Sequence, residues 1–347
     1  MRFVTTPVPR DVWARVASAD PQAMPSQTPE WLGTLPAHLV DASRLYETGT
    51  GRLAVLPLVR DRRFPRFAGV EGSYPATYGF GGVVAEGGTT ADVVAAIVAD
   101  LAATTGGLLA LAIWPNPLQG EHWERACPPG WARTRRRAHV VDLRDGVDAL
   151  WARMPGNGRR GVRRAERAEV HIETDCSGAL LPAFFELLDE SRERWARGGH
   201  EPAWMARWRA RRDSVGAWQR TVDALSGRCR VSLASWQGEP VAGTIVLTGP
   251  NAHYTHGAMH KETAARCYAN YALHWHEIRA AAASGASAYH MGESGASSSL
   301  ARFKEQFGAT PHDYADYRYE RLPISRVDRA LRTAVKRAIR FQEPGPA

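Results

Sequence analysis

Apolar residues recur along the chain at two different spacings, and each spacing predicts a different kind of element. From 90 to 104 the apolar side chains recur every three to four positions, which predicts a helix capped by Thr90. Continuous apolar runs at 53–60 and 107–114 predict strands, and Pro57 places the first of them at an edge or a bulge. The first half of the chain is therefore expected to alternate strands and helices.

The second half, from about residue 146, predicts a longer and more regular order of elements. The turn Gln237-Gly238-Glu239 joins two apolar runs as a hairpin. The chain is therefore expected to be α/β (α+β), with mixed central sheets flanked by helices. In chain order the predictions are a helix from 147, a basic helix over 159–167, a strand over 170–173, helices over 178–197 and 214–226, strands over 228–236, 240–248 and 252–258, a helix over 264–283, a strand over 286–291, a helix over 298–307, a strand over 313–320 and a basic amphipathic helix over 325–341.

The length of the chain favours two domains. It has 347 residues, and a single hydrophobic core stops growing at roughly 250–300 residues. The change in pattern divides it into an N-terminal domain over 1–145, a second domain over 146–324, and a basic helix and tail over 325–347. No exact repeat is present, but both halves are compatible with degenerate copies of one module.

The charge of the chain points to an anionic partner. The net charge is +8 and the pI about 9.6, which favours nucleic acid, nucleotides or an anionic membrane surface. A composition that simply prefers arginine to lysine is the alternative. The arginines gather in three runs, at 133–137, 159–167 and 207–212.

Several classes of protein are not supported by the sequence. The four cysteines have no metal-ligand spacing, and no His-Glu-x-x-His motif is present, so no metal site is expected. The first residues contain no apolar core typical of a signal peptide, and no apolar run approaches the roughly 18–20 residues that cross a bilayer. We therefore expect a soluble, cytoplasmic protein.

The element order from residue 146 resembles a GNAT-type acyltransferase domain, and three segments resemble the signatures of the Fem family. They are the arginine-rich stretch Arg159–Val170, the strand entry Pro240–Thr244, and Leu-Ala-Arg-Phe-Lys-Glu-Gln-Phe-Gly at 300–308. The aromatic, glycine-rich loop over 74–82 is similar more weakly. One departure is His-Met-Gly-Glu at 290–293, where many Fem-like proteins have Asp-Phe-Gly-Gly or similar.

The resemblance implies two GNAT-like domains and a specific kind of reaction. Fem-like enzymes transfer an aminoacyl group from aminoacyl-tRNA to an amine, typically on a peptidoglycan precursor. Some relatives in antibiotic pathways aminoacylate other small amines. An aminoacyl ester is already activated and the amine is the nucleophile, so the enzyme needs proximity, a partner for the developing oxyanion and a route for one proton. No Ser-His-Asp triad is required.

Lys304 and Glu293 are the candidate catalytic residues. In the resembled motif the matching lysine lies at the active site near the reacting carbonyl, where it stabilises the oxyanion or binds a phosphate. The alternative for Lys304 is a solvated lysine paired with Glu305. Glu293 follows a predicted strand and is placed to accept a proton or bind an amine; the alternative is that it caps the next helix.

The candidate binding residues form two groups, each with a structural alternative. Aromatic and motif residues are expected to contact the substrate, and core packing is the alternative for the aromatic side chains. Arginines of the basic helix are expected to contact phosphates of tRNA or of a nucleotide-linked acceptor, and a solvated face beside Glu166 and Glu169 is the alternative. The first group is Tyr74, Tyr78, Tyr254, Tyr271, Arg302 and Phe303; the second is Arg159, Arg160, Arg163 and Arg164.

Three functions remain open from the sequence. The first is a Fem-like aminoacyltransferase that uses aminoacyl-tRNA as co-substrate and no cofactor. The second is an acyl-CoA-dependent N-acyltransferase, although the stretch His256–Arg266 lacks the glycine-rich loop that holds pyrophosphate in such enzymes. The third is a non-catalytic RNA- or membrane-binding protein with a GNAT core. Peripheral contact with a membrane is a further expectation, and no stable protein partner is predicted.

Overall fold

The computed structural model describes residues 1–73, 79–199, 213–295 and 297–322. They form two compact units. The first comprises Met1–Ala138 with Gly249–Asn251 and the described residues from Pro311 onward; the second comprises His139–Thr248 with Ala252–Thr310. Strands β9 (Ala132–Asp142) and β15 (Thr310–Glu320) each contribute residues to both units. The predicted terminal helix over 325–341 lies outside the described residues.

The described residues of the first unit form two sheets and three α-helices. The smaller sheet has the antiparallel order β1-β3-β4-β7, and the larger continues from β9 and β15 through β8, β6 and β5 to β2. Buried aromatic residues such as Tyr46, Trp123 and Tyr317 fill the main core of this unit. The elements are β1 (Arg2–Thr5), α1 (Arg10–Ala19), β2 (Leu39–Asp41), β3 (Arg44–Glu47), β4 (Leu53–Leu56), β5 (Val59–Asp61), β6 (Gly69–Ser73), β7 (Val84–Ala85), α2 (Ala91–Thr104), β8 (Leu108–Ile113) and α3 (Gly120–Ala126).

The prediction of one strand over 53–60 is wrong, because the segment divides at Pro57. Residues before the proline form β4 in the smaller sheet, and residues after it form β5 in the larger one. Proline has no N–H to donate to a strand ladder, so the run cannot continue through one sheet. The helix predicted over 90–104 is confirmed, and the Thr90 hydroxyl accepts a hydrogen bond from the backbone N–H of Val93.

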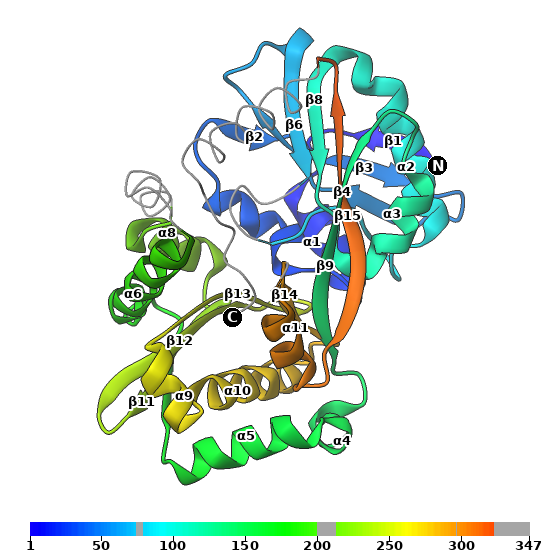
Figure 1. Ribbon diagram of the computed structural model, residues 1–347. Coiled ribbons are helices and arrows are strands. Elements are labelled where there is room, and N and C mark those ends of the chain that lie inside the picture. Colours follow the sequence, from blue (N-terminus) through cyan, green and yellow to red (C-terminus); the bar gives the residue numbers. More distant parts are fainter. Residues whose placement is uncertain (74–78, 200–212, 296, 323–347) are drawn as a thin grey trace. The chain divides into compact units, whose positions relative to one another are not determined.

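The second unit has one mixed sheet with helices on both faces (Figure 1). Its strand order is β10-β11-β12-β13-β14-β9. Figure 1 shows α6 and α8 on one face, and α10 with α5 beyond it on the other. The elements are α4 (Gly146–Arg153), α5 (Gly156–Arg167), β10 (His171–Asp175), α6 (Leu181–Gly199), α8 (Val215–Leu225), β11 (Cys229–Trp236), β12 (Glu239–Leu247), β13 (Ala252–Met259), α9 (Lys261–Cys267), α10 (Ala269–Ala283), β14 (Ala288–Glu293) and α11 (Ser298–Glu305).

The predicted α/β architecture is confirmed, including the β11–β12 hairpin, whose turn residues Gln237 and Gly238 have φ values of 55° and 86°. The single helix predicted over 264–283 is wrong. It breaks at Tyr268, which has φ 60° and ends α9 in a left-handed conformation. Among the described residues, no helix combines the length and the apolar character that crossing a bilayer requires.

Candidate active site

The candidate site lies where two neighbouring strands of the second unit stop pairing. The parallel strands β13 and β14 are paired only at Ala252 with Tyr289 and at His253 with His290. Beyond these residues β13 continues to pair with β12 as far as Met259, while β14 runs on to Glu293. The carbonyls of Gly292 and Glu293 at the end of β14 accept hydrogen bonds from Lys304 of α11.

Helix α11 carries Lys304 to the end of β14. The Ser297 hydroxyl caps the helix by accepting a hydrogen bond from the N–H of Leu300. One turn later the Lys304 side chain is buried, with only 2% of the residue exposed. Its Nζ donates to the carbonyl oxygens of Gly292 at 3.0 Å and Glu293 at 2.7 Å. The alternative of a solvated lysine paired with Glu305 is therefore wrong, and the Glu305 carboxylate instead lies 3.7 Å from His139.

Burial changes the ionisation of Lys304. Removal of the ammonium from water lowers the pKa of Lys304 to about 7, although the negative charge of Glu293 opposes the shift. The buried imidazoles of His253 and His274 have their pKa values lowered to about 3, mainly by burial and also by the positive charge of Lys304. Both histidines are therefore neutral at pH 7. Lys304, in contrast, is a group of this site whose charge changes near neutral pH.

Aromatic rings form the wall beside Lys304. Phe303 on α11 and Phe307, just beyond the end of α11, lie 5.3 Å apart, and each contacts Tyr271 and His274 of α10 at ring distances between 5.3 and 5.7 Å. The Tyr271 hydroxyl donates to the side-chain carbonyl of Gln306. Phe303 and Tyr271 thus pack in this wall, and their contacts fix α11 against α10.

Two glycines allow the basic helix α5 to approach this wall. A Cβ atom built on Gly158 would lie 1.9 Å from the backbone oxygen of Gln306, and one built on Gly161 would lie 2.4 Å from the ring of Tyr271. No real side chain tolerates such distances, so only glycine fits at both positions. The spacing of three places both glycines on one face of α5. This spacing is a sequence signal for close helix packing, and it is overlooked when only the arginines of the segment are considered.

The four arginines of α5 that were predicted to bind phosphates have separate local contacts. Arg159 donates to the carbonyls of Trp151 and Ala152 at the end of α4. The other three are exposed. Arg160 donates to the side chain of Asn157 and Arg163 lies over the ring of Trp151, while Arg164 donates to the hydroxyl of Tyr268.

Of the remaining predicted residues, Tyr254 lies against the aromatic wall, with its ring 4.7 Å from that of His274. The Tyr254 hydroxyl covers Gly257, where an added Cβ would lie 2.1 Å away, and burial raises the pKa of Tyr254 to about 12. Arg302 points to the exposed side of α11 and donates to Ser298 in the same helix. Tyr74 and Tyr78 lie outside the described residues. The structure thus brings Lys304, Glu293, Tyr271 and Phe303 together and places Arg302 apart from them.

The basic run at 133–137 is largely paired with acids of the first unit. Arg136 lies 2.7 Å from Asp316, and Arg137 lies 2.6 Å from Asp313. Arg133 lies 2.9 Å from Glu124. These ion pairs reduce the positive charge that the run offers to a partner. The third run, at 207–212, lies outside the described residues.

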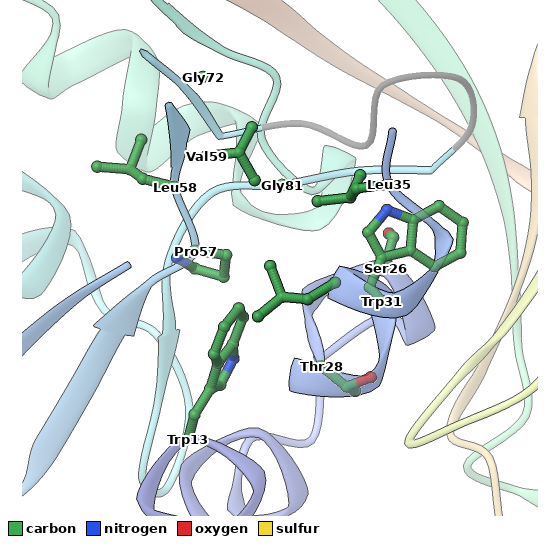
Figure 2. Close-up of a pocket in the computed structure, with 11 residues that line it drawn as sticks. Trp13, Ser26, Thr28, Trp31, Leu35, Pro57, Leu58, Val59, Gly72 and Gly81 are labelled. Atoms are coloured by element: carbon green, nitrogen blue, oxygen red, sulfur yellow. The ribbon is translucent and has the colours of Figure 1, made fainter. Parts of the chain in front are cut away.

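The first unit contains a small pocket that is separate from Lys304 (Figure 2). Its cavity of about 20 Å³ has room for about one water molecule. Trp13, Trp31 and Pro57 line it, and none of the predicted site residues that the structure describes does. The pocket is too small to hold an acceptor substrate. Within the described part of the chain, no group of three or more His, Cys, Asp or Glu side chains is arranged to hold a metal ion.

Comparison with known proteins finds a matching family model and solved structures with a similar fold. Residues 152–305 match the family model of the acetyltransferase (GNAT) domain. The chain is similar to the crystal structure of FemX with a TM-score of 0.65 and 13% identity, over 92% of this chain and 97% of that one. No curated protein sequence matches the chain.

Two further structures are similar at lower scores. The C-terminal domain (DUF2156) of a putative lysylphosphatidylglycerol synthetase from Agrobacterium fabrum has a TM-score of 0.49 and 12% identity, over 89% of this chain and 92% of that one. A tandem GNAT protein from the clavulanic acid biosynthesis pathway has a TM-score of 0.43 and 14% identity, over 90% and 93%.

Proposed function

Because the chain has the fold of a Fem-like protein of the GNAT superfamily, we propose that it is an aminoacyltransferase. In this proposal it moves an aminoacyl group from aminoacyl-tRNA to the amine of a peptidoglycan precursor or of a small-molecule intermediate in antibiotic biosynthesis. The observation that carries the proposal is Lys304, whose ammonium is buried at the point where β13 and β14 stop pairing. Burial of a cation is costly, and a role in the reaction accounts for that cost.

Lys304 has one N–H group available for the reacting carbonyl. A charged lysine has three N–H donors, and within the described part of the chain two of them are donated to the carbonyls of Gly292 and Glu293. These two bonds fix the position of Nζ before substrate binds. A donor held in place in this way stabilises a developing oxyanion without a reorganisation cost.

The reaction requires one bond to form and one to break. The acceptor amine attacks the ester carbonyl, and the C–N bond forms as the carbonyl oxygen becomes an oxyanion beside Lys304. The ester C–O bond then breaks, and the ribose oxygen leaves with the proton that the amine nitrogen gives up. Since the pKa of Lys304 is about 7, its ammonium also exchanges a proton readily at neutral pH. Glu293 lies next to this ammonium and is proposed to bind the incoming amine.

The donor is proposed to be tRNA for two reasons. The junction between β13 and α9 offers no glycine-rich loop for a pyrophosphate, because Gly257 is covered by the hydroxyl of Tyr254 and α9 begins at Lys261 after His260. The helix α5, in contrast, exposes several arginines along its outer face. Such a face suits the phosphates of an RNA backbone. Acyl-CoA is the alternative donor, and the match to the acetyltransferase (GNAT) domain keeps it open.

The donor is tested by supplying each candidate separately. The protein is incubated with an amine-bearing peptidoglycan precursor or a panel of small amines, together with either aminoacyl-tRNA or acetyl-CoA. We expect an amide product only with aminoacyl-tRNA, and its formation should be abolished by ribonuclease treatment of the tRNA before the reaction. Product formed with acetyl-CoA alone would overturn the proposed donor, and absence of product from both donors would favour a non-catalytic binding protein.

The role of Lys304 is tested with a matched lysine variant. Lys304→Met removes the ammonium and should lower turnover by at least about 100-fold, the usual effect of losing one oxyanion donor. Lys261→Met is the control, because Lys261 is exposed at the start of α9. Equal turnover of the Lys304→Met variant and the wild type would refute the mechanism.

A further inference from the structure

One end of the larger sheet in the first unit carries large apolar side chains that face water. Phe67 is 76% exposed, Leu322 is 56% exposed and Phe64 is 38% exposed. We call these three residues the apolar rim. Single exposed apolar residues are common on protein surfaces, but three at one end of one sheet form a feature that needs an explanation.

The strand register places the rim residues at the same end of the sheet. Gly69, which begins β6, pairs with Leu108, which begins β8. Leu322 follows Arg321, whose N–H donates to the carbonyl of Leu109. Both segments therefore border the start of β8. Figure 1 shows β15 ending beside the start of β8 at this end of the unit.

Arginines lie beside the apolar rim on both of its segments. Residues 61–68 and 318–322 contain five arginines and two acids. Arg63 pairs with Asp61, and Arg318 lies 3.3 Å from Glu320. Each of the two acids is thus paired with an arginine of its own segment. The exposed Arg62 and Arg321 add positive charge beside the rim. Apolar side chains at a surface edged by arginine are the combination that attaches proteins to the interface of an anionic bilayer.

We propose that the apolar rim docks this chain on an anionic lipid surface. Phe67 and Leu322 enter the headgroup region, while Arg62 and Arg321 contact lipid phosphates. A single-stranded nucleic acid is the less suitable partner, because base stacking needs aromatic faces; Phe67 offers one, but Phe64 is only 38% exposed and Leu322 has no ring. The inference does not depend on aminoacyl transfer, so a failure of the proposed function leaves it standing.

The proposal is tested by sedimentation with lipid vesicles. The full chain is mixed with vesicles of phosphatidylcholine that contain about one third phosphatidylglycerol, and the bound fraction is measured. We expect Phe67→Ser combined with Leu322→Ser to weaken binding by about tenfold, since insertion of both side chains removes apolar surface from water. Binding of the wild type should also fall with added salt or with pure phosphatidylcholine.

A matched control is available in the second unit. Trp195 on α6 is 49% exposed, so Trp195→Ser removes a large exposed aromatic side chain that is not part of the rim. It should leave vesicle binding unchanged. Equal thermal unfolding midpoints of all variants would show that the rim substitutions leave the fold intact.

Two results would overturn the proposal. The first is wild-type protein that stays in the supernatant with anionic vesicles, or rim variants that bind as tightly as the wild type. The second comes from a parallel titration with a single-stranded RNA oligonucleotide. If the rim variants lose RNA binding and keep vesicle binding, the rim is a nucleic-acid surface instead.

Discussion

The charge state of Lys304 gives a quantitative prediction that needs no knowledge of the substrates. In an unfolded chain this lysine has a pKa of 10.5, whereas in the folded chain burial lowers it to about 7. At pH 6 both states carry the proton. Between pH 7 and pH 10.5 the unfolded chain keeps the proton while the folded chain loses it. The folded state therefore gains stability as pH rises through this window, and loses that gain as pH falls back to 7.

The size of the effect follows from the width of the window. Each unit of pKa difference corresponds to about 1.4 kcal/mol, so the shift from 10.5 to about 7 amounts to roughly 5 kcal/mol in the free energy of unfolding. About 3 kcal/mol of it falls between pH 7 and pH 9.5. Lys304→Met has no proton to bind, so this part of the pH dependence should disappear in the variant. The difference between wild type and variant cancels the titration of the groups that do not interact with Lys304.

The composition of the chain makes the ionisation directly measurable. It contains three lysines, Lys261, Lys304 and Lys336, so a protein labelled with ¹³C-lysine gives three side-chain Cε signals in an NMR titration. The signal that disappears in Lys304→Met should titrate near pH 7. The exposed Lys261, assigned through Lys261→Met, serves as the reference for an accessible lysine. Urea unfolding of wild type and variant over the same pH range measures the corresponding stability.

One result would refute the reasoning. If the Lys304 signal titrates above about pH 9.5, the ammonium is adequately solvated or paired, and the burial argument fails. In that case the stability difference between wild type and Lys304→Met would also be flat between pH 7 and pH 9.5.

Two further predictions concern the packing that holds the site. Gly158→Ala should destabilise the fold by about 2 kcal/mol or more, because its Cβ would lie 1.9 Å from the Gln306 oxygen; Gly216→Ala, with nothing within 4 Å of the added atom, should be neutral or slightly stabilising in the same unfolding assay. Thr90→Ala removes the cap from the N–H of Val93 and should cost about 1 kcal/mol in chemical denaturation, while Thr90→Ser should keep most of the stability; an unchanged midpoint in Thr90→Ala would contradict the capping role.

Elements with strong local signals were predicted correctly, and elements set by distant contacts were not. Helix α2 and the hairpin of β11 and β12 follow from a cap, a period and a turn within a few residues. Strand β9 was missed because its arginines interrupt the alternation of apolar and polar residues that predicts a strand. The acids that pair with these arginines, Asp313 and Asp316, are far away in the sequence. The division of 53–60 was missed because Pro57 was expected to mark an edge strand or a bulge within one strand. In the structure the chain passes from one sheet to the other at this residue.

For the candidate site, the motif at 300–308 singled out Lys304 but not its surroundings. Helical period places Phe303 and Phe307 on one face of the helix predicted over 298–307, yet it does not indicate that Lys304 is buried as well. That depends on the carbonyls of Gly292 and Glu293, which β14 presents to Nζ. The buried His253 and His274 had no sequence signal that separates them from the other histidines. Their neutral state follows from desolvation, which is a property of the packed unit.

The sequence by itself determined the α/β class, most element boundaries in the second half, the basic character of α5 and the identity of Lys304 as a candidate. These depend on local period, turn residues, composition and a short motif. Only the tertiary structure decided that Lys304 is buried with a pKa near 7, that Gly158 and Gly161 admit α5 against α10 and α11, and that two exposed segments meet in the apolar rim. Such properties depend on which surfaces lose water when remote segments pack together, and no local pattern specifies that.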